Sequence, residues 1–381
     1  MKKKLLALAV AGAFVAPAAM ADTANVNVYG VVNMSFDSTS TGTGCVAASP
    51  AVCVATQSAS NTKISSNQSR FGIKGSEDLG GGMNAFFQVE QLINPDDASA
   101  VATNGVLATR NSFVGIGGES WGSVLLGTND SPYKTSTRGM DLFGDTLGDN
   151  RSLMGGIKGK SSALAFDGRP ANVLQYDSPN LSGFKVSLQY HAGAETAAAN
   201  ASKGNAYSLS GTYAQGPMNL VAAYETHDFG AGAGDLIAIA PAAADQKEKS
   251  YKLGGSYTMD QITGILVYEK TSDDFAAANK KEHRSWYLAG KFAISGSDAV
   301  KLAYTNVGNL NSVANTGAKQ ISLGYDHAMS KRTTVYALYT KLTNDSAINY
   351  TLGINGTTGV AAPSGFDADP SAFQIGVKHS F

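Results

Sequence analysis

Large apolar and polar side chains alternate along much of the chain, the pattern of β-strands whose two faces meet different surroundings. In residues 184–191 every second side chain, from Phe184 to Tyr190, is large and apolar, and those between, from Lys185 to His191, are polar. The chain is therefore predicted to be all-β. Sixteen such segments can be placed, some shorter than a spanning strand needs: 25–36, 68–77, 83–93, 110–117, 123–128, 171–177, 184–192, 206–214, 218–227, 250–258, 264–271, 284–294, 299–307, 319–328, 333–342 and 371–381.

The connections between these segments alternate in length. Tight turns with Gly, Pro, Asn or Asp at favourable positions occur at 78–82, 118–122, 178–183, 215–217, 260–263, 295–298 and 330–332. Long connections lie between them at 37–67, 94–109, 129–170, 193–205, 228–249, 272–283, 308–318 and 343–370. An even number of antiparallel strands, with short turns on one rim and long loops on the other, is typical of bacterial outer-membrane barrels. The last segment runs to Phe381 and is expected to pair with the first, near Asn25, and so close the sheet.

The composition of the two faces favours a membrane barrel. Beyond residue 21 no run of 18 apolar residues could form a membrane-spanning helix, and a closed barrel is the other structure that pairs every backbone group inside hydrocarbon. A barrel of this width leaves an aqueous channel, so the polar face is expected to point inward. Tyrosines at segment ends suit aromatic girdles at the two interfaces: Tyr190, Tyr213, Tyr224, Tyr257, Tyr268, Tyr304, Tyr325 and Tyr339.

Residues 1–21 have the organisation of a cleaved secretory signal peptide. Three lysines at positions 2–4 precede an apolar stretch at 5–16, and Ala19 and Ala21 form a small-x-small cleavage site before Asp22. No linker or composition shift divides residues 22–381, which are predicted to form a single barrel domain. Loss of the three lysines leaves 26 Lys+Arg against 30 Asp+Glu, a net charge of −4, which argues against a nucleic-acid partner.

The longest connection, 129–170, is the candidate for narrowing the channel by folding into the lumen. It holds five acidic and six basic residues, and basic side chains on the inward faces of early strands are expected to lie opposite it. Opposed charged rows would create a transverse field that tunes ion preference; the alternative is that each charge is merely solvated. The near-equal count leaves the sign of the selectivity open. The candidate constriction residues are Arg70, Lys74, Arg110, Arg138, Asp141, Asp145 and Asp149.

Cys45 and Cys53 are the two cysteines, both in the first long connection. In an exported chain the pair is predicted to form a disulfide. A metal site is the less favoured alternative, because structural zinc sites use four ligands.

Catalytic signatures are absent from the sequence. The five histidines, at positions 191, 227, 283, 327 and 379, lie in separate segments, and neither His-Glu-x-x-His nor Gly-x-Ser-x-Gly occurs. No catalytic, cofactor-binding or metal-binding residue is assigned. An outer-membrane enzyme or an adhesin that acts through its loops stays as an alternative class.

Several motifs carry a family resemblance. Ser69-Arg-Phe-Gly-Ile-Lys-Gly-Ser-Glu-Asp-Leu-Gly80, followed by Asn84-Ala-Phe-Phe-Gln-Val-Glu-Gln91, resembles the second and third strands of trimeric general-diffusion porins of the neisserial and β-proteobacterial type. In the same order and spacing come Arg110-Asn-Ser-Phe-Val-Gly115 with Trp121-Gly-Ser-Val-Leu-Leu-Gly127, Asn172-Val-Leu-Gln-Tyr-Asp-Ser-Pro179 with Ser182-Gly-Phe184, and Gly376-Val-Lys-His-Ser-Phe381. The resemblance covers the whole mature chain.

The resemblance implies a 16-stranded transmembrane β-barrel with periplasmic turns, extracellular loops and an inward-folded third loop. It also implies a homotrimer in the outer membrane, surrounded by lipid and lipopolysaccharide, with Phe381 read by the barrel assembly machinery. The expected function is passive diffusion of ions and small hydrophilic solutes; a channel preferring small organic anions or peptides is the alternative. Thr128 stands where family members often carry a basic residue, which weakens the transfer of a strongly anion-selective cluster.

Overall fold

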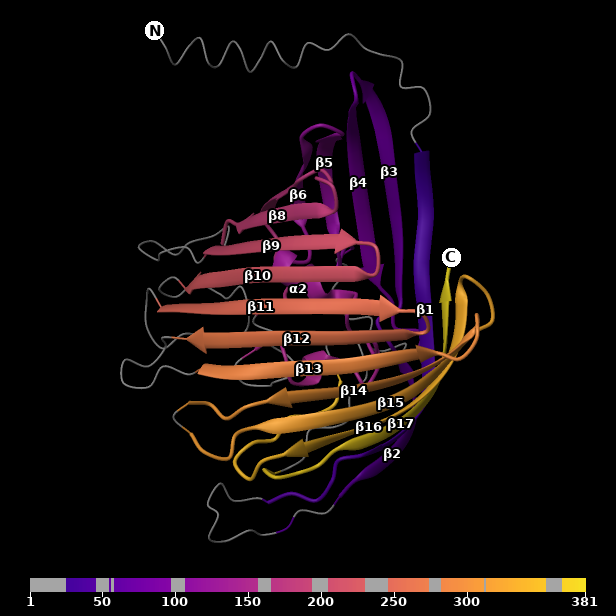
Figure 1. Ribbon diagram of the computed structural model, residues 1–381, viewed down its shortest axis with the longest axis vertical. Coiled ribbons are helices and arrows are strands. Elements are labelled where there is room, and N and C mark those ends of the chain that lie inside the picture. The colour runs from indigo at the N-terminus through magenta and orange to yellow at the C-terminus, as the bar shows by residue number, and fades with distance from the viewer. Residues whose placement is uncertain are drawn as a thin grey trace.

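The chain folds into a closed antiparallel β-barrel (Figure 1). The computed structural model describes residues 25–45, 55, 58–96, 107–156, 166–193, 205–229, 246–273, 282–311, 313–353 and 365–381. Residues 1–21, the predicted signal peptide, lie outside this described part. In the part that is described, no helix has the length and apolar composition needed to cross a bilayer.

The wall is built from 17 strand segments joined in one sheet. Their bounds are β1 (Asn25–Ser40), β2 (Ser60–Ser66), β3 (Arg70–Gly80), β4 (Met83–Leu92), β5 (Ser112–Gly118), β6 (Gly122–Thr128), β7 (Val173–Asp177), β8 (Phe184–His191), β9 (Asn205–Gln215), β10 (Met218–Phe229), β11 (Gln246–Met259), β12 (Ile262–Asp273), β13 (Glu282–Ala293), β14 (Asp298–Val307), β15 (Ala318–Ala328), β16 (Thr333–Asn344) and β17 (Ser371–Ser380).

β2 and β3 are two parts of one strand, because both pair with β1. The interruption falls at residues 67–69, where Gln68 has a left-handed backbone with φ 59°. Counted this way, the barrel has 16 strands, which confirms the predicted fold. The prediction was wrong about residues 60–66, which were assigned to a long loop, and about β1, which extends to Ser40 instead of ending at residue 36.

The barrel closes where β1 pairs with β17, as predicted. Gly30 and Phe381 exchange two backbone hydrogen bonds of 3.1 Å at the end of this seam that lies near the short turns. A Cβ at Gly30 would collide with the ring of Phe381. The glycine therefore provides the space in which the terminal aromatic ring packs.

The two faces of the wall differ as the alternation predicts. Leu302, Leu323 and Phe373 are about half exposed on the outside, whereas Thr305, Ser322 and Gln374 are buried on the inside. The tyrosines expected at the interfaces include several exposed ones: Tyr190, Tyr257, Tyr304, Tyr325 and Tyr339.

The inner face is not polar throughout, contrary to the prediction. Val221, Ile265 and Val267 point inward and are buried, in a cluster that includes Met140 and Phe143 of the connection after β6. Part of the inner wall of β10, β12 and β13 is therefore apolar, at the place where another part of the chain covers it.

Tight turns join the strands at one rim. The turn between β3 and β4 has three successive glycines with positive φ, Gly80, Gly81 and Gly82, a geometry that other residues adopt at a cost. The long connections lie at the opposite ends of the strands.

Cys45 lies beyond the end of β1 and is in a disulfide. Its backbone exchanges hydrogen bonds with Phe366. The predicted partner, Cys53, lies outside the described residues.

Candidate pore constriction

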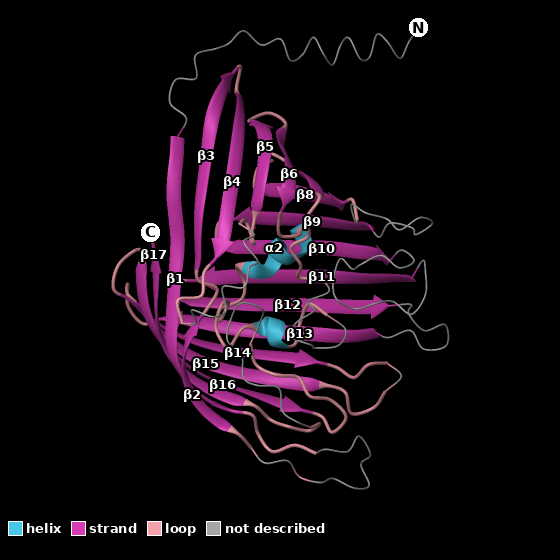
Figure 2. Ribbon diagram, turned by 180° about the vertical axis from the view of Figure 1, so that it is seen from behind, coloured by secondary structure: helices cyan, strands magenta, loops and turns pink. Residues whose placement is uncertain are grey.

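The connection between β6 and β7 enters the barrel instead of staying at the rim. It carries α2 (Pro132–Arg138) and the 3₁₀-helix η1 (Asn150–Ser152), and both helical pieces lie inside the wall of strands (Figure 2). The side chain of Ser131 accepts a hydrogen bond from the Lys134 N–H and caps α2, which begins with Pro132. Asp149 caps η1 by accepting from the Arg151 N–H. We call the described parts of this connection, residues 129–156 and 166–172, the inner loop.

Two wall glycines receive apolar side chains of the inner loop. A Cβ at Gly324 in β15 would lie 2.7 Å from the ring of Phe143, and a Cβ at Gly254 in β11 would lie 3.0 Å from the sulfur of Met140. A second apolar cluster joins Leu147 of the loop to wall residues that include Leu342. Close packing against the wall therefore fixes the loop at two places.

Buried polar groups hold the other side of the inner loop to β11 and β12. The Tyr133 hydroxyl donates to Glu269 at 2.8 Å, and the Gly155 N–H donates to the same carboxylate at 2.8 Å. Lys252 Nζ lies 2.9 Å from Asp167 Oδ1. Each group is matched by a partner of opposite charge or polarity, as buried polar groups require.

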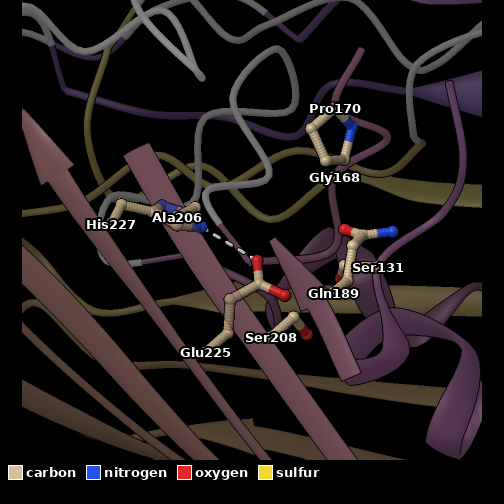
Figure 3. Close-up of a pocket in the computed structure, with 8 residues that line it drawn as sticks. All are labelled: Ser131, Gly168, Pro170, Gln189, Ala206, Ser208, Glu225 and His227. Carbon is tan, nitrogen blue, oxygen red and sulfur yellow. Dashed lines mark hydrogen bonds and ion pairs between the residues drawn. The ribbon is translucent and has the colours of Figure 1, made fainter. Parts of the chain in front are cut away.

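A histidine stands at a third attachment point (Figure 3). His227 of β10 lies between two carboxylates, with Nε2 2.9 Å from Glu225 and Nδ1 2.6 Å from Glu248. The ring of Phe166 stacks on the imidazole, with centroids 4.9 Å apart. The adjoining cavity of about 20 Å³, lined in part by Ser131, is large enough for one water molecule.

Three predicted constriction carboxylates lie in one cluster with loop arginines. Arg138 lies 3.4 Å from Asp141, 3.3 Å from Asp145 and 2.8 Å from Asp149. Arg151 lies 3.4 Å from Asp145 and 2.9 Å from Asp149. Asp141 and Asp149 are buried, with side chains 1% and 0% exposed, whereas Asp145 is 22% exposed. Of the three, Asp145 presents the most charge to the lumen.

This cluster changes the acidity of its carboxyl groups. Burial alone would raise the pKa of Asp149, but the guanidinium groups of Arg138 and Arg151 outweigh it and hold that pKa well below its usual range. Burial and the neighbouring Asp149 charge raise the pKa of Asp141 to about 6, although Arg138 opposes them. One member of the cluster can therefore take up a proton near neutral pH.

Of the three predicted basic residues opposite the loop, Arg70 contacts the cluster. Arg70 Nη1 is 3.5 Å from Asp145 Oδ2, which joins wall and inner loop across the lumen. Arg110 Nε is 2.5 Å from Glu90 Oε1, and Arg70 Nε is 3.9 Å from Oε2 of the same carboxylate. Lys74 lies over the ring of Tyr29, 5.0 Å from its centroid.

The arrangement differs from two opposed rows of charge. Arg138, Asp145 and Arg70 follow one another from the inner loop to the wall and alternate in sign. The loop carboxylates are thus shared between the loop's own arginines and the wall. The seven candidate residues lie in two adjacent groups, one on the inner loop and one on β3 and the residues preceding β5.

Two charged wall residues were missed by the sequence reasoning. Glu90 in β4 pairs with both Arg70 and Arg110. Lys378 in β17 interacts electrostatically with Asp145 and Arg70. The alternation of side chains along a strand places both residues on the inner face. Glu90 lies opposite Gly72 in the pairing of β3 with β4, and Lys378 lies between Val377 and His379, whose side chains point outward.

Among the described residues, no group of three or more His, Cys, Asp or Glu side chains has an arrangement that could hold a metal ion. His379 lies on the outer face near the short-turn rim, where its Nδ1 is 2.9 Å from the Thr333 hydroxyl.

Comparison with known proteins gives relatives along the whole chain. The chain is 29% identical to outer membrane porin protein 32 of Delftia acidovorans over 388 aligned residues, with all of both chains covered. It is 26% identical to an outer membrane porin of Bordetella pertussis with the same coverage. It is 27% identical to the major outer membrane protein P.IB of Neisseria lactamica, with 87% of this chain and 91% of the relative covered.

Solved structures share the fold. The anion-selective porin from Comamonas acidovorans superposes with a TM-score of 0.73 at 23% identity, covering 94% of this chain and all of that one. The trimer form of OmpT from Vibrio cholerae superposes with a TM-score of 0.65 at 16% identity, covering 94% and 100%. The model of the Gram-negative porin family matches residues 7–347. With its closed 16-stranded barrel, the chain belongs to the Gram-negative porin family of the outer membrane.

Proposed function

We propose that this porin is a passive diffusion channel whose size limit and ion preference are set where the inner loop meets β1, β3, β4 and β17. The observation that carries the proposal is the contact between Arg70 of the wall and Asp145 of the inner loop, 3.5 Å apart and both partly exposed. Solutes diffuse through the water-filled lumen without any covalent step. Arg70, Lys74, Arg110, Arg138, Asp141, Asp145 and Asp149 act through their charge and size.

The charge balance of this region supports a modest preference for anions. Its basic side chains are Arg70, Lys74, Arg110, Arg138, Arg151 and Lys378. Its acidic side chains are Glu90, Asp141, Asp145 and Asp149, which leaves an excess of two positive charges. The excess is small because four carboxylates lie among these six basic side chains. The Comamonas porin that shares the fold is anion-selective, which agrees with this sign.

Zero-current potentials in a planar bilayer under a KCl gradient test the proposal. Arg70→Ala, Lys74→Ala and Arg110→Ala should each shift the potential toward cation preference, because each removes a positive charge from the narrowing. Lys319→Ala is the matched control, since Lys319 is exposed on the outward-facing side of β15. Potentials that stay at the wild-type value in all three wall variants would exclude these residues from the constriction.

The same recordings address the alternative, a channel that prefers small organic anions or peptides. A general diffusion channel gives conductance proportional to salt concentration. Saturation of the conductance by one small solute would instead indicate a binding step in the lumen.

The assembly proposed is a homotrimer. Its support is the family itself and the trimer form of the OmpT relative in structure. Conductance steps are expected in groups of three. Native mass spectrometry is expected to detect a trimer that dissociates on heating. We further propose cleavage after Ala21, for which a mature amino terminus at Asp22 is the expected mass-spectrometric result.

A further inference from the structure

The last long connection, between β16 and β17, is partly buried. We call its described parts, residues 345–353 and 365–370, the final loop. Tyr350 and Leu352 of this loop are only 1% and 0% exposed, although they lie beyond the end of β16. Connections at the rim of a fold ordinarily run over its surface. Another part of the protein therefore covers these two side chains.

The residues around η1 of the inner loop provide this cover. Both side chains belong to one apolar cluster with Leu147 and Leu153. Next to this cluster, the Gly353 N–H donates a hydrogen bond to the Ser152 hydroxyl at 3.3 Å. The two leucines lie on either side of η1 in the sequence. The final loop therefore braces this short helix at both of its ends.

One buried amide holds the final loop in shape. Asn344, the last residue of β16, is 4% exposed. Its Nδ2 donates to the Tyr350 carbonyl at 2.9 Å and to the Ala368 carbonyl at 2.5 Å, and its Oδ1 accepts from the Tyr350 N–H at 2.9 Å. Its own backbone N–H donates to Asp369 at 3.0 Å. Asn344 thus ties the limb that leaves β16 to the limb that enters β17.

The helix that the final loop braces carries a charge of the candidate constriction. Arg151 of η1 lies 2.9 Å from Asp149 and 3.4 Å from Asp145, and the next residue is Ser152. A shift of the final loop would therefore move this guanidinium relative to its carboxylates. We propose that Asn344 is a positioning residue of the pore, which holds η1, through the final loop, where Arg151 pairs with both aspartates. The inference rests on the proposed diffusion channel and its constriction.

The test records zero-current potentials under a KCl gradient and open-channel current noise of the folded mature porin in planar bilayers. Asn344→Ala should raise the noise several-fold, because η1 loses its brace. It should also lower the permeability ratio of chloride to potassium, because Asp145 loses part of its neutralisation by Arg151.

The isosteric variant Asn344→Asp separates hydrogen bonding from packing. Its carboxylate would face the carbonyl oxygens of Tyr350 and Ala368, which need a donor. Asn344→Asp should therefore disturb the channel at least as much as Asn344→Ala does. Wild-type noise and selectivity in Asn344→Asp would overturn the proposal, because they would leave the side chain a role in packing alone.

The Tyr350 ring provides a second point of attack on the same path. Its hydroxyl is buried and has no hydrogen-bond partner among the described residues, so the ring is held by packing. Tyr350→Phe should keep the wild-type noise and selectivity, whereas Tyr350→Ala should reproduce Asn344→Ala. Wild-type behaviour of Tyr350→Ala would break the path from Asn344 to η1 and so refute the inference.

Asn309→Ala is the matched control. Asn309 Oδ1 accepts hydrogen bonds from the Thr316 and Gly317 N–H groups, both at 2.8 Å, and so organises the connection between β14 and β15. None of the described residues of that connection, 308–311 and 313–317, belongs to the cluster around η1. Asn309→Ala should therefore leave noise and selectivity unchanged. An effect as large as that of Asn344→Ala would reduce the result to a general loosening of the rim.

A double-mutant comparison tests whether Asn344 acts through Arg151. Arg151→Gln alone should lower the permeability ratio, and adding Asn344→Ala should then change the ratio little. Additive effects would indicate two independent sites and would contradict the proposal. Heat-modified gel mobility verifies folding, and Tyr350→Ala supplies the same comparison where Asn344→Ala does not insert. Failure of the proposed channel function would show in the unshifted Arg70, Lys74 and Arg110 variants, whereas failure of this inference leaves their shifts intact.

Discussion

Gly324 is one of the wall residues that fix the position of the inner loop. The ring of Phe143 occupies the space that a side chain at this position would take. Gly324→Leu should therefore displace Phe143, at a packing cost of about 1–3 kcal/mol, and loosen the loop. Single-channel recordings should show a larger and noisier conductance. Gly264→Leu is the control, because a Cβ there would meet nothing within 4 Å; equal conductance in both variants would contradict the role of Gly324.

Glu90 is the carboxylate that neutralises the basic wall. Glu90→Gln should raise the anion preference, because Arg110 and Arg70 lose the charge that lies 2.5 Å and 3.9 Å from them. The reversal potential under a KCl gradient measures the shift. Glu90→Gln combined with Arg110→Gln removes one charge of each sign, and its reversal potential should return toward the wild-type value. A shift of the single variant toward cations would disprove this account.

Sequence alone predicts which residues of the wall point inward but not what they meet. Arg70 and Lys74 follow from strand parity, and the same parity could have identified Glu90 and Lys378. The pairing of Arg138 with three aspartates of its own loop could not be predicted, because it depends on the irregular path of the chain between α2 and η1. Charge counting treats these groups as separate, whereas the fold brings them within contact distance.

At the scale of elements, the inner loop is expected to respond to pH. Asp141, with a pKa of about 6, is ionised at pH 7 and protonated at pH 5. Asp149 keeps its charge over this range because Arg138 and Arg151 hold its pKa low. The cluster therefore becomes more positive on acidification, and the anion preference should rise as pH falls through 6. Reversal potentials measured from pH 7.5 to 4.5 test this, and Asp141→Asn should abolish the step.

A second step is expected on the alkaline side. Burial lowers the pKa of Lys134 in α2 to about 8, although Asp130, 2.8 Å away, opposes the shift. As pH rises through 8, the loss of this positive charge should reduce the anion preference. Lys134→Gln removes the titrating group, so a step that persists in this variant would have to come from another residue.

The strand that sequence reasoning missed, β2, has little hydrophobic alternation. β2 has the sequence Ser-Asn-Thr-Lys-Ile-Ser-Ser, in which Ile64 is the one large apolar residue. The other residues of β2 are small or polar on both faces, so alternation alone was too weak to predict a strand. Conversely, the inward valine and isoleucine of β12 break the alternation at residues 264–267. That run of apolar residues was the available signal that something covers the inner wall.

At the scale of the whole molecule, Phe381 combines a structural contact with the proposed recognition by the assembly machinery. Phe381→Ala removes the ring that packs on Gly30 and leaves the backbone pairing of the seam available. The amount of heat-modifiable barrel in the outer membrane should fall several-fold, while the channels that do insert keep the wild-type conductance. Normal insertion of the variant would refute the assembly role; Phe373→Ala, an exposed ring on the outer face of the same strand, is the control.

The seam between β1 and β17 also sets the order in which the barrel can form. Val31 is paired with Ser380, so this contact joins segments separated by almost the whole sequence. Every other neighbouring pair of strands can form a hairpin as soon as its two members are available, whereas the seam has the highest loop-closure cost. Until β17 docks, β1 and β16 are both open edges that hydrocarbon does not tolerate. Entry of the complete barrel into the bilayer is therefore limited by closure of the cylinder, a step that follows translocation of the entire chain.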